Sequence, residues 1–134
     1  MAATRGWLDA QGCPFTRIAV FPEGRPAAAK DFDALIDTGF TGFVQVPRRL
    51  ATSIGLTAIG EMEITYPDDT TEPVPVAWAS IRLGSETREG FVFIPDRGEI
   101  LIGVHFLRLF GKTLIHSVAD GLVVLTDQAP TQID

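Results

Sequence analysis

Residues 34–42 read ALIDTGFTG, and this stretch decides how the rest of the chain is interpreted. Three apolar residues run directly into an acid, a hydroxyl and a glycine. A strand that ends in this way lifts the carboxylate of Asp37 to the rim of a groove. The hydroxyl of Thr38 can hold the following loop by hydrogen bonds, and Gly39 lets another backbone approach closely. The segment therefore predicts one carboxylate held at a strand end, with Thr38 and Gly39 as its support.

A second segment, EILIG at residues 99–103, precedes a stretch with the periodicity of a short helix. Its Leu101-Ile102-Gly103 step begins 64 positions after Asp37. The two segments, in this order, resemble those of retropepsin-like aspartic proteases, the single-domain relatives of the viral enzymes. The resemblance covers roughly residues 15 to 118. It implies an all-β fold, a closed and mostly antiparallel acid-protease barrel with a flap hairpin and a short C-terminal helix, and it makes Asp37 the catalytic residue.

The residues that follow each glycine set this chain apart from many members of that family. Many retropepsins have Ala and then Asp after the active-site glycine, and an Arg after the later glycine that pairs with this Asp. Here the corresponding positions are Phe40, Thr41 and Val104. Both halves of the ion pair are missing together, which indicates a subfamily with different dimer contacts. The Phe40-Thr41-Gly42 sequence resembles predicted bacterial aspartyl proteases of the same clan.

Peptide hydrolysis without a metal or a covalent nucleophile needs two carboxylates around one water molecule. Carboxylates about 3 Å apart share one proton, so one acts as a base and the other as an acid. Because the chain has a single Asp-Thr-Gly, the resemblance implies a homodimer in which Asp37 meets Asp37 of a second copy. It implies an aspartic endopeptidase that takes peptide or protein substrates. Thr38 would brace the partner loop, and Gly39 would receive the substrate backbone.

Residues 61–76 are predicted to form the flap hairpin that this family places over its groove. Met62, Ile64 and Tyr66 alternate along the first arm, so one wet and one dry face are expected. Prolines at 73 and 75 cannot donate to a ladder, which indicates an edge strand. Viral flaps are glycine-rich at the tip and this one has no glycine there, so an exposed acidic β-turn is the alternative interpretation. The predicted tip consists of Tyr66, Pro67, Asp68, Asp69 and Thr70.

Composition limits the possible partners. The 134 residues, 46% hydrophobic and 21% charged, are typical of one globular domain, which we expect to span residues 1–134. The net charge is −6 and Arg48-Arg49 is the only basic pair, so no nucleic-acid partner is expected. No apolar run approaches the roughly 20 residues that span a bilayer, and no signal peptide is visible, so we expect a cytoplasmic protein without membrane contact. The single Cys13 and the isolated His105 and His116 predict no disulfide, metal or cofactor.

Frequent Gly and Pro divide the rest of the chain into short runs that favour an all-β domain. Residues 1–12 are expected to form a loose N-terminal arm or an edge strand, and the tail 128–134 is expected to fray. Residues 84–90 form a predicted polar turn, and the apolar run 122–125 predicts a strand covered on both faces. Asp120-Gly121 predicts a two-residue hairpin turn. The other predicted elements are strands at 15–21, 27–36, 43–46, 81–83, 91–94 and 113–119, and helices at 47–54 and 103–110.

Three alternatives stay open at this point. A non-catalytic peptide-binding or dimerisation module on the same fold would carry the same single Asp37. A self-contained barrel that never dimerises would leave Asp37 unpaired and inactive. Residues 31–38 also look superficially like the Asp-x-Asp signature of haloacid-dehalogenase-like phosphatases. That chemistry needs Thr or Val where Leu35 stands, and it needs a βαβ pattern that this sequence lacks.

Overall fold

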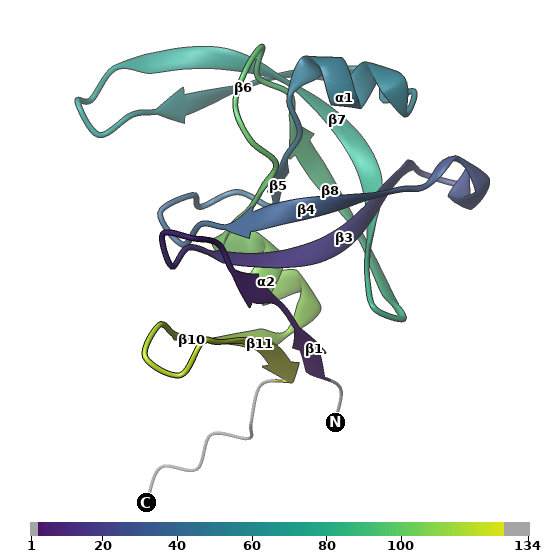
Figure 1. Ribbon diagram of the computed structural model, residues 1–134. Coiled ribbons are helices and arrows are strands. Elements are labelled where there is room, and N and C mark those ends of the chain that lie inside the picture. Colours follow the sequence, from purple (N-terminus) through teal and green to yellow (C-terminus); the bar gives the residue numbers. More distant parts are fainter. Residues whose placement is uncertain (1–2, 128–134) are drawn as a thin grey trace, which may run out of the picture.

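The computed structural model describes residues 3–127, and most of its elements are β-strands (Figure 1). This confirms the predicted all-β class and both predicted α-helices. The strands are β1 (Ala3–Arg5), β2 (Trp7–Leu8), β3 (Pro14–Pro22), β4 (Lys30–Ile36), β5 (Val44–Gln45), β6 (Gly60–Thr65), β7 (Thr71–Leu83), β8 (Glu86–Phe93), β9 (Leu101–Ile102), β10 (Lys112–Ser117) and β11 (Leu122–Asp127). The helices are the 3-10 turn η1 (Pro26–Ala28), α1 (Arg48–Ser53) and α2 (Val104–Phe110).

The larger sheet of the described chain has the strand order β2-β3-β4-β9-β5-β8-β7-β6. The β4–β9 and β5–β8 pairs are parallel and the others are antiparallel, as the prediction of a mostly antiparallel fold requires. Strand β3 also pairs with β7, so the sheet curls back on itself. Short β9 lies between β4 and β5, which places two segments about 65 residues apart in the sequence side by side.

The main hydrophobic core takes side chains from both α-helices and from the strands β3 to β11 with the exception of β6. Phe43, just before β5, is fully buried and stacks on two rings of α2. Its ring centroid lies 5.8 Å from that of Phe106 and 6.4 Å from that of Phe110. Gly111 ends α2 in the left-handed conformation, which glycine adopts without strain. These contacts fix α2 against the loop that joins β4 to β5.

A smaller sheet in the order β1-β11-β10 joins the two ends of the described chain. The buried ammonium of Lys112, at the start of β10, ties this sheet to β8. Its Nζ lies 2.5 Å from Oδ1 of Asp127 and 2.6 Å from Oε2 of Glu86. Burial alone would lower the pKa of Lys112, but the hydrogen bonds and charges of these two carboxylates outweigh it, so the pKa is raised above its ordinary value.

The N-terminal segment is not a loose arm over residues 3–8, and the alternative prediction of an edge strand is confirmed there. Strand β1 pairs with β11, and β2 pairs with β3. Gly6 lets the chain cross between the two sheets, because a Cβ at this position would lie 2.0 Å from the carbonyl oxygen of Phe15. Trp7 then stacks on Phe15 at 6.2 Å between ring centroids. Strands of two or three residues are too short to show an alternation in the sequence.

Other local predictions also need correction. The predicted polar turn 84–90 is only Gly84-Ser85, and the residues after it continue β8 with their polar side chains exposed. Asp120-Gly121 lies in a four-residue loop, because Ser117 pairs with Leu122. On β11 only Val123 and Leu125 are buried, so the run 122–125 has one covered face. The predicted frayed tail lies outside the described residues. No helix within residues 3–127 is long and apolar enough to cross a membrane.

Candidate active site

Asp37 is the first residue after β4, and β9 holds it in place. Leu35 and Ile36 pair in parallel with Leu101 and Ile102. The amide of Asp37 donates a hydrogen bond of 2.9 Å to the carbonyl of Ile102. The apolar residues before Asp37 explain this position, because Ile36 and Ile102 are both buried and pull the strand ends into the core. The half-buried Asp37 therefore stands where the strand leaves the core.

The carboxylate of Asp37 organises its own loop. Its Oδ1 accepts a hydrogen bond of 2.9 Å from the amide of Gly39, and its carbonyl accepts one of 3.0 Å from the amide of Phe40. The Asp37 side chain thus forms an Asx turn, and this turn fixes the carboxylate. Its Oδ2 makes no hydrogen bond to the described residues. Thr38 is exposed, and within residues 3–127 its hydroxyl has no hydrogen-bond partner.

The first turn of α2 holds the same loop from the other side. The amide of Gly103 donates to the carbonyl of Phe43 at 3.1 Å, and the amide of Val104 donates to that of Phe40 at 2.9 Å. A Cβ on Gly103 would lie 2.3 Å from the Phe40 carbonyl oxygen and 2.4 Å from that of Gly42. Backbone hydrogen bonds thus join the two segments at Phe40 and Val104. In the resembled family the ion pair joins the positions of Thr41 and Val104. The close approach explains the glycine of the Leu101-Ile102-Gly103 step.

The predicted flap is a hairpin of β6 and β7, with register pairs from Gly60–Val76 to Thr65–Thr71. It needs no glycine, because Asp69 itself adopts the left-handed backbone conformation with φ of 66°. The amide of Tyr66 donates to the carbonyl of Thr70 at 2.8 Å and closes the tip. The hydroxyl and amide of Thr70 both donate to Oδ1 of Asp68, and these bonds lower the pKa of Asp68 below its ordinary value.

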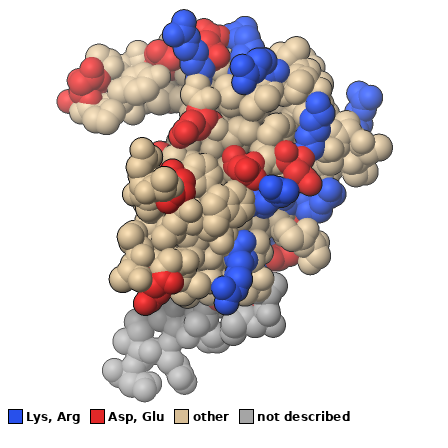
Figure 2. Space-filling model, viewed as in Figure 1, with Lys and Arg blue, Asp and Glu red and all other residues tan. Residues whose placement is uncertain are grey.

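A groove of about 700 Å³ lies between this hairpin and the Asp37 loop. Figure 2 shows the flap reaching out over a hollow, with acidic side chains near its end. Of the residues singled out from the sequence, the groove brings together Asp37, Gly39, Leu101, Tyr66 and Pro67. The others do not line it, because they point into the core or lie beyond the rim. These are Thr38, Asp68, Asp69, Thr70, Ile102 and Gly103.

Comparison with known proteins shows which solved structures share the fold of this chain. Neither a family model nor a curated protein matches the sequence. Among solved structures, EIAV protease complexed with the inhibitor HBY-793 matches 80% of this chain and 96% of its own, with a TM-score of 0.63 and 12% identity. A retropepsin-like aspartic protease from Rickettsia conorii matches 92% of this chain and 90% of its own, with a TM-score of 0.60 and 16% identity. The chain has the retropepsin-like fold. That confirms the resemblance drawn from Asp37 and the later glycine.

Some residues that line the groove of this retropepsin-like fold were not predicted. The ring of Phe93 on β8 meets Phe40 edge to face, with centroids 5.7 Å apart. Both pack with Ile64, Val74 and Val76 in a small apolar cluster that joins the flap base to the groove floor. No motif marks Phe93, because only the pairing of β8 with β5 and β7 brings it there. The apolar run Phe91-Val92-Phe93 at the end of β8 was the available sign that this part of the strand contributes buried side chains.

The groove is acidic. Of the described residues that line it, Asp37 and Glu63 carry charge, and neither a lysine nor an arginine is among them. Asp37 and Glu63 make no hydrogen bond with each other. Within the described residues, the Asp37 carboxylate therefore has one oxygen bound to the Gly39 amide and the other open to the groove.

Proposed function

We propose that this protein is an aspartic endopeptidase that works as a homodimer. The observation that carries the proposal is Asp37, held at the base of a groove that a hairpin overhangs. Within residues 3–127 its Oδ2 is unbonded and no second carboxylate is hydrogen-bonded to it. The retropepsin-like fold supports it. A second copy supplies the missing Asp37, and two-fold symmetry brings the two carboxylates together.

The two Asp37 carboxylates share one proton, because like charges at such close range cannot both ionise. The ionised one takes a proton from water, whose oxygen forms a bond to the peptide carbonyl carbon. The protonated one gives its proton to the carbonyl oxygen. When the tetrahedral intermediate collapses, the C–N bond breaks and a proton passes to the leaving amine. No metal or cofactor takes part, and the apparent pKa values belong to the pair.

The remaining residues have supporting roles in this proposal. The free hydroxyl of Thr38 braces the partner loop, and Gly39 receives the substrate backbone. Tyr66, Pro67, Asp68, Asp69 and Thr70 form a flap tip that covers an extended peptide. The outer face of β10 and β11 supplies apolar contact area for the second copy, since Ile115 is 42% exposed and the paired Val124 is half-buried.

The test is cleavage of a mixed peptide library between about pH 3 and 8, at high protein concentration. Asp37→Asn keeps the side-chain volume but cannot share a proton, so we expect it to lower kcat/KM by about 10³-fold or more. Asp31→Asn is the matched control, because Asp31 is exposed at the far end of the same strand. The wild type is expected to be most active on the acidic side.

The mass in solution must be measured on the same samples, by light scattering. Cleavage that survives Asp37→Asn would rule out the aspartic mechanism. A wild type that binds peptides or dimerises but never cleaves would favour the non-catalytic module. A stable monomer at all working concentrations would contradict the shared site.

A further inference from the structure

A second hollow of about 540 Å³ continues the active groove along the flap. The two hollows adjoin, because they share four lining residues: Thr41, Gly42, Glu63 and Phe93. The second hollow then runs between Met62 of β6, Trp78 of β7 and Phe91 of β8. An extended peptide that crosses Asp37 and continues along the groove enters this space, because a strand rises about 3.3 Å per residue.

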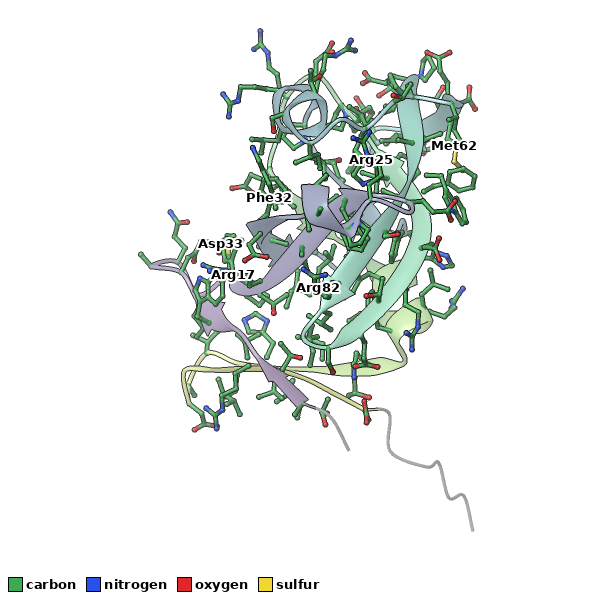
Figure 3. All side chains as sticks on the ribbon, turned by 90° about the vertical axis from the view of Figure 1, so that its right-hand side faces the viewer. Arg17, Arg25, Phe32, Asp33, Met62 and Arg82 are labelled. Atoms are coloured by element: carbon green, nitrogen blue, oxygen red, sulfur yellow. The ribbon has the colours of Figure 1, made fainter. Side chains whose placement is uncertain are left out.

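The walls of the second hollow present aromatic surface to solvent. Trp78 and Phe91 are each 41% exposed, and their rings meet edge to face with centroids 5.0 Å apart. Met62 is 42% exposed, and Figure 3 shows it on the flap at the edge of the molecule. Such a cluster would normally be buried in a protein of this size. The face of an indole or phenyl ring also attracts cations.

Carboxylates surround these rings. Glu63 and Glu89 line the hollow, and Oε2 of Glu23 accepts a hydrogen bond of 3.0 Å from Nε1 of Trp78. The carboxyl groups of Glu23 and Glu89 interact with each other, which lowers the pKa of Glu23 and raises that of Glu89. The Trp78 hydrogen bond lowers the pKa of Glu23 further. Two carboxyl groups are thus held next to one indole ring.

No lysine or arginine within residues 3–127 lines either hollow. Figure 3 shows three of the arginines, Arg17, Arg25 and Arg82, apart from Met62. Arg17 pairs with Asp33, and the guanidinium of Arg82 lies over the ring of Phe21. Within residues 3–127, the carboxylates that line the second hollow therefore face no lysine or arginine of its lining, and they are complementary to a cation.

We propose that the second hollow binds a lysine or arginine side chain of the peptide whose backbone crosses Asp37. This inference rests on the proposed endopeptidase function and adds its substrate class, extended peptides with a basic residue several positions from the cleaved bond. The aliphatic stem of the basic side chain packs on Met62 and Phe91, and its charged end lies among Trp78, Glu89 and Glu23.

The cleavage test uses neutral peptides that carry a single arginine at successive positions, each paired with a peptide that has glutamine instead. We expect one position at which arginine lowers KM by about fivefold for the wild type. The double variant Glu23→Gln/Glu89→Gln keeps the volumes and the acceptor for Trp78, and it should remove this preference while kcat for the glutamine peptide stays unchanged. Asp31→Asn is the control for loss of a distant charge. A preference that the double variant retains, or no preference at all, would overturn the proposal.

Binding separates failure of this inference from failure of the catalytic proposal. Asp37→Asn/Trp7→Phe leaves Trp78 as the only tryptophan, so its fluorescence reports on the second hollow. Arginine peptides should change this fluorescence at lower concentration than glutamine peptides, whether or not the wild type cleaves. If arginine peptides bind preferentially but the wild type cleaves no peptide, the basic-residue site is supported and the endopeptidase proposal is contradicted. Cleavage by the wild type without that binding preference would keep the endopeptidase proposal and contradict the basic-residue site.

Discussion

The base of the groove and the flap over it are built in opposite ways. At the base, Gly103 is buried, and a Cβ there would lie within 2.4 Å of two carbonyl oxygens. At the flap, Gly60 has no atom within 4 Å of the place where its Cβ would be. The base is fixed by contacts within one chain. Most of the surface of the flap is free to contact another molecule.

The side chains of β6 show the same difference. The alternation of Met62, Ile64 and Tyr66 predicts a dry face, but only Ile64 is half-buried, and the other two are at least 40% exposed. The prediction of a dry face is wrong for the isolated chain, because the hairpin projects beyond the core. Segments with few buried apolar contacts open at low free-energy cost, as a binding flap requires.

The largest expected effect comes from placing a methyl group at each of the two glycines. Gly103→Ala should lower the free energy of unfolding by about 3 kcal/mol, because the clash is with backbone oxygens that cannot rotate away. Gly60→Ala is the matched control, and it should be neutral or stabilise by up to about 1 kcal/mol. Urea unfolding followed by tryptophan fluorescence measures both. If both variants lose the same free energy of unfolding, the base of the groove is packed no more closely than the flap.

A middle-sized effect is expected at Tyr66, which lines the groove from the flap and is 40% exposed. Tyr66→Ala should leave the free energy of unfolding within about 0.5 kcal/mol of wild type, because little packing is lost. It should raise KM for a cleaved peptide by about tenfold, because the ring is buried only when substrate is bound.

Tyr66→Phe is the control for the ring itself. Burial and the contact with Glu72 raise the pKa of the Tyr66 hydroxyl, but the groove contact is made by the ring. The phenylalanine variant should therefore keep a nearly normal KM. If Tyr66→Ala destabilises the fold as much as Gly103→Ala does, the flap is part of the core and the comparison fails.

The sequence allowed the base of the groove to be predicted better than its walls. Asp37 and Gly103 lie in short segments whose local sequence is enough to predict the local structure. In each segment an apolar strand is followed by a turn or a helix. The small β1 and β2 and the wall residue Phe93 depend on pairing between distant segments, which no local pattern records. The second hollow depends on three separate strands, and no sequence feature marked Trp78 or Glu89 as neighbours of the groove.

The position of the flap tip was predicted, but the backbone conformation and hydrogen bonds that form its turn were not. The tip contains no glycine, and L-residues disfavour positive φ. Asp69 nevertheless has φ of 66°, and the neighbouring Asp68 anchors Thr70. Aspartate tolerates this conformation better than most residues do. The Asp-Asp pair of the tip was therefore a turn signal in itself.

The smallest expected effect is a pH dependence confined to this tip. The hydroxyl and amide of Thr70 hold the pKa of Asp68 below its ordinary value of 3.8. A lowered folded-state pKa means that the contribution to stability is complete above 3.8 and is lost as pH falls through the folded-state value. The turn should loosen only at the acid end, while the base of the groove is unaffected. Side-chain NMR titration of Asp68, with the Thr70 amide shift as a second probe, measures this.

Thr70→Val tests the cause of that pH dependence. It removes the hydroxyl, whose hydrogen bond to Oδ1 of Asp68 measures 2.6 Å, and keeps the amide donor. The pKa of Asp68 should rise part of the way toward 3.8, since one of its two donors remains. The amide shifts of Gly39 and Gly103 should not follow this titration, because the base of the groove shares no hydrogen bond with the tip. If they do follow it, the two regions are coupled, and acid that opens the flap would also disturb the loop that holds Asp37.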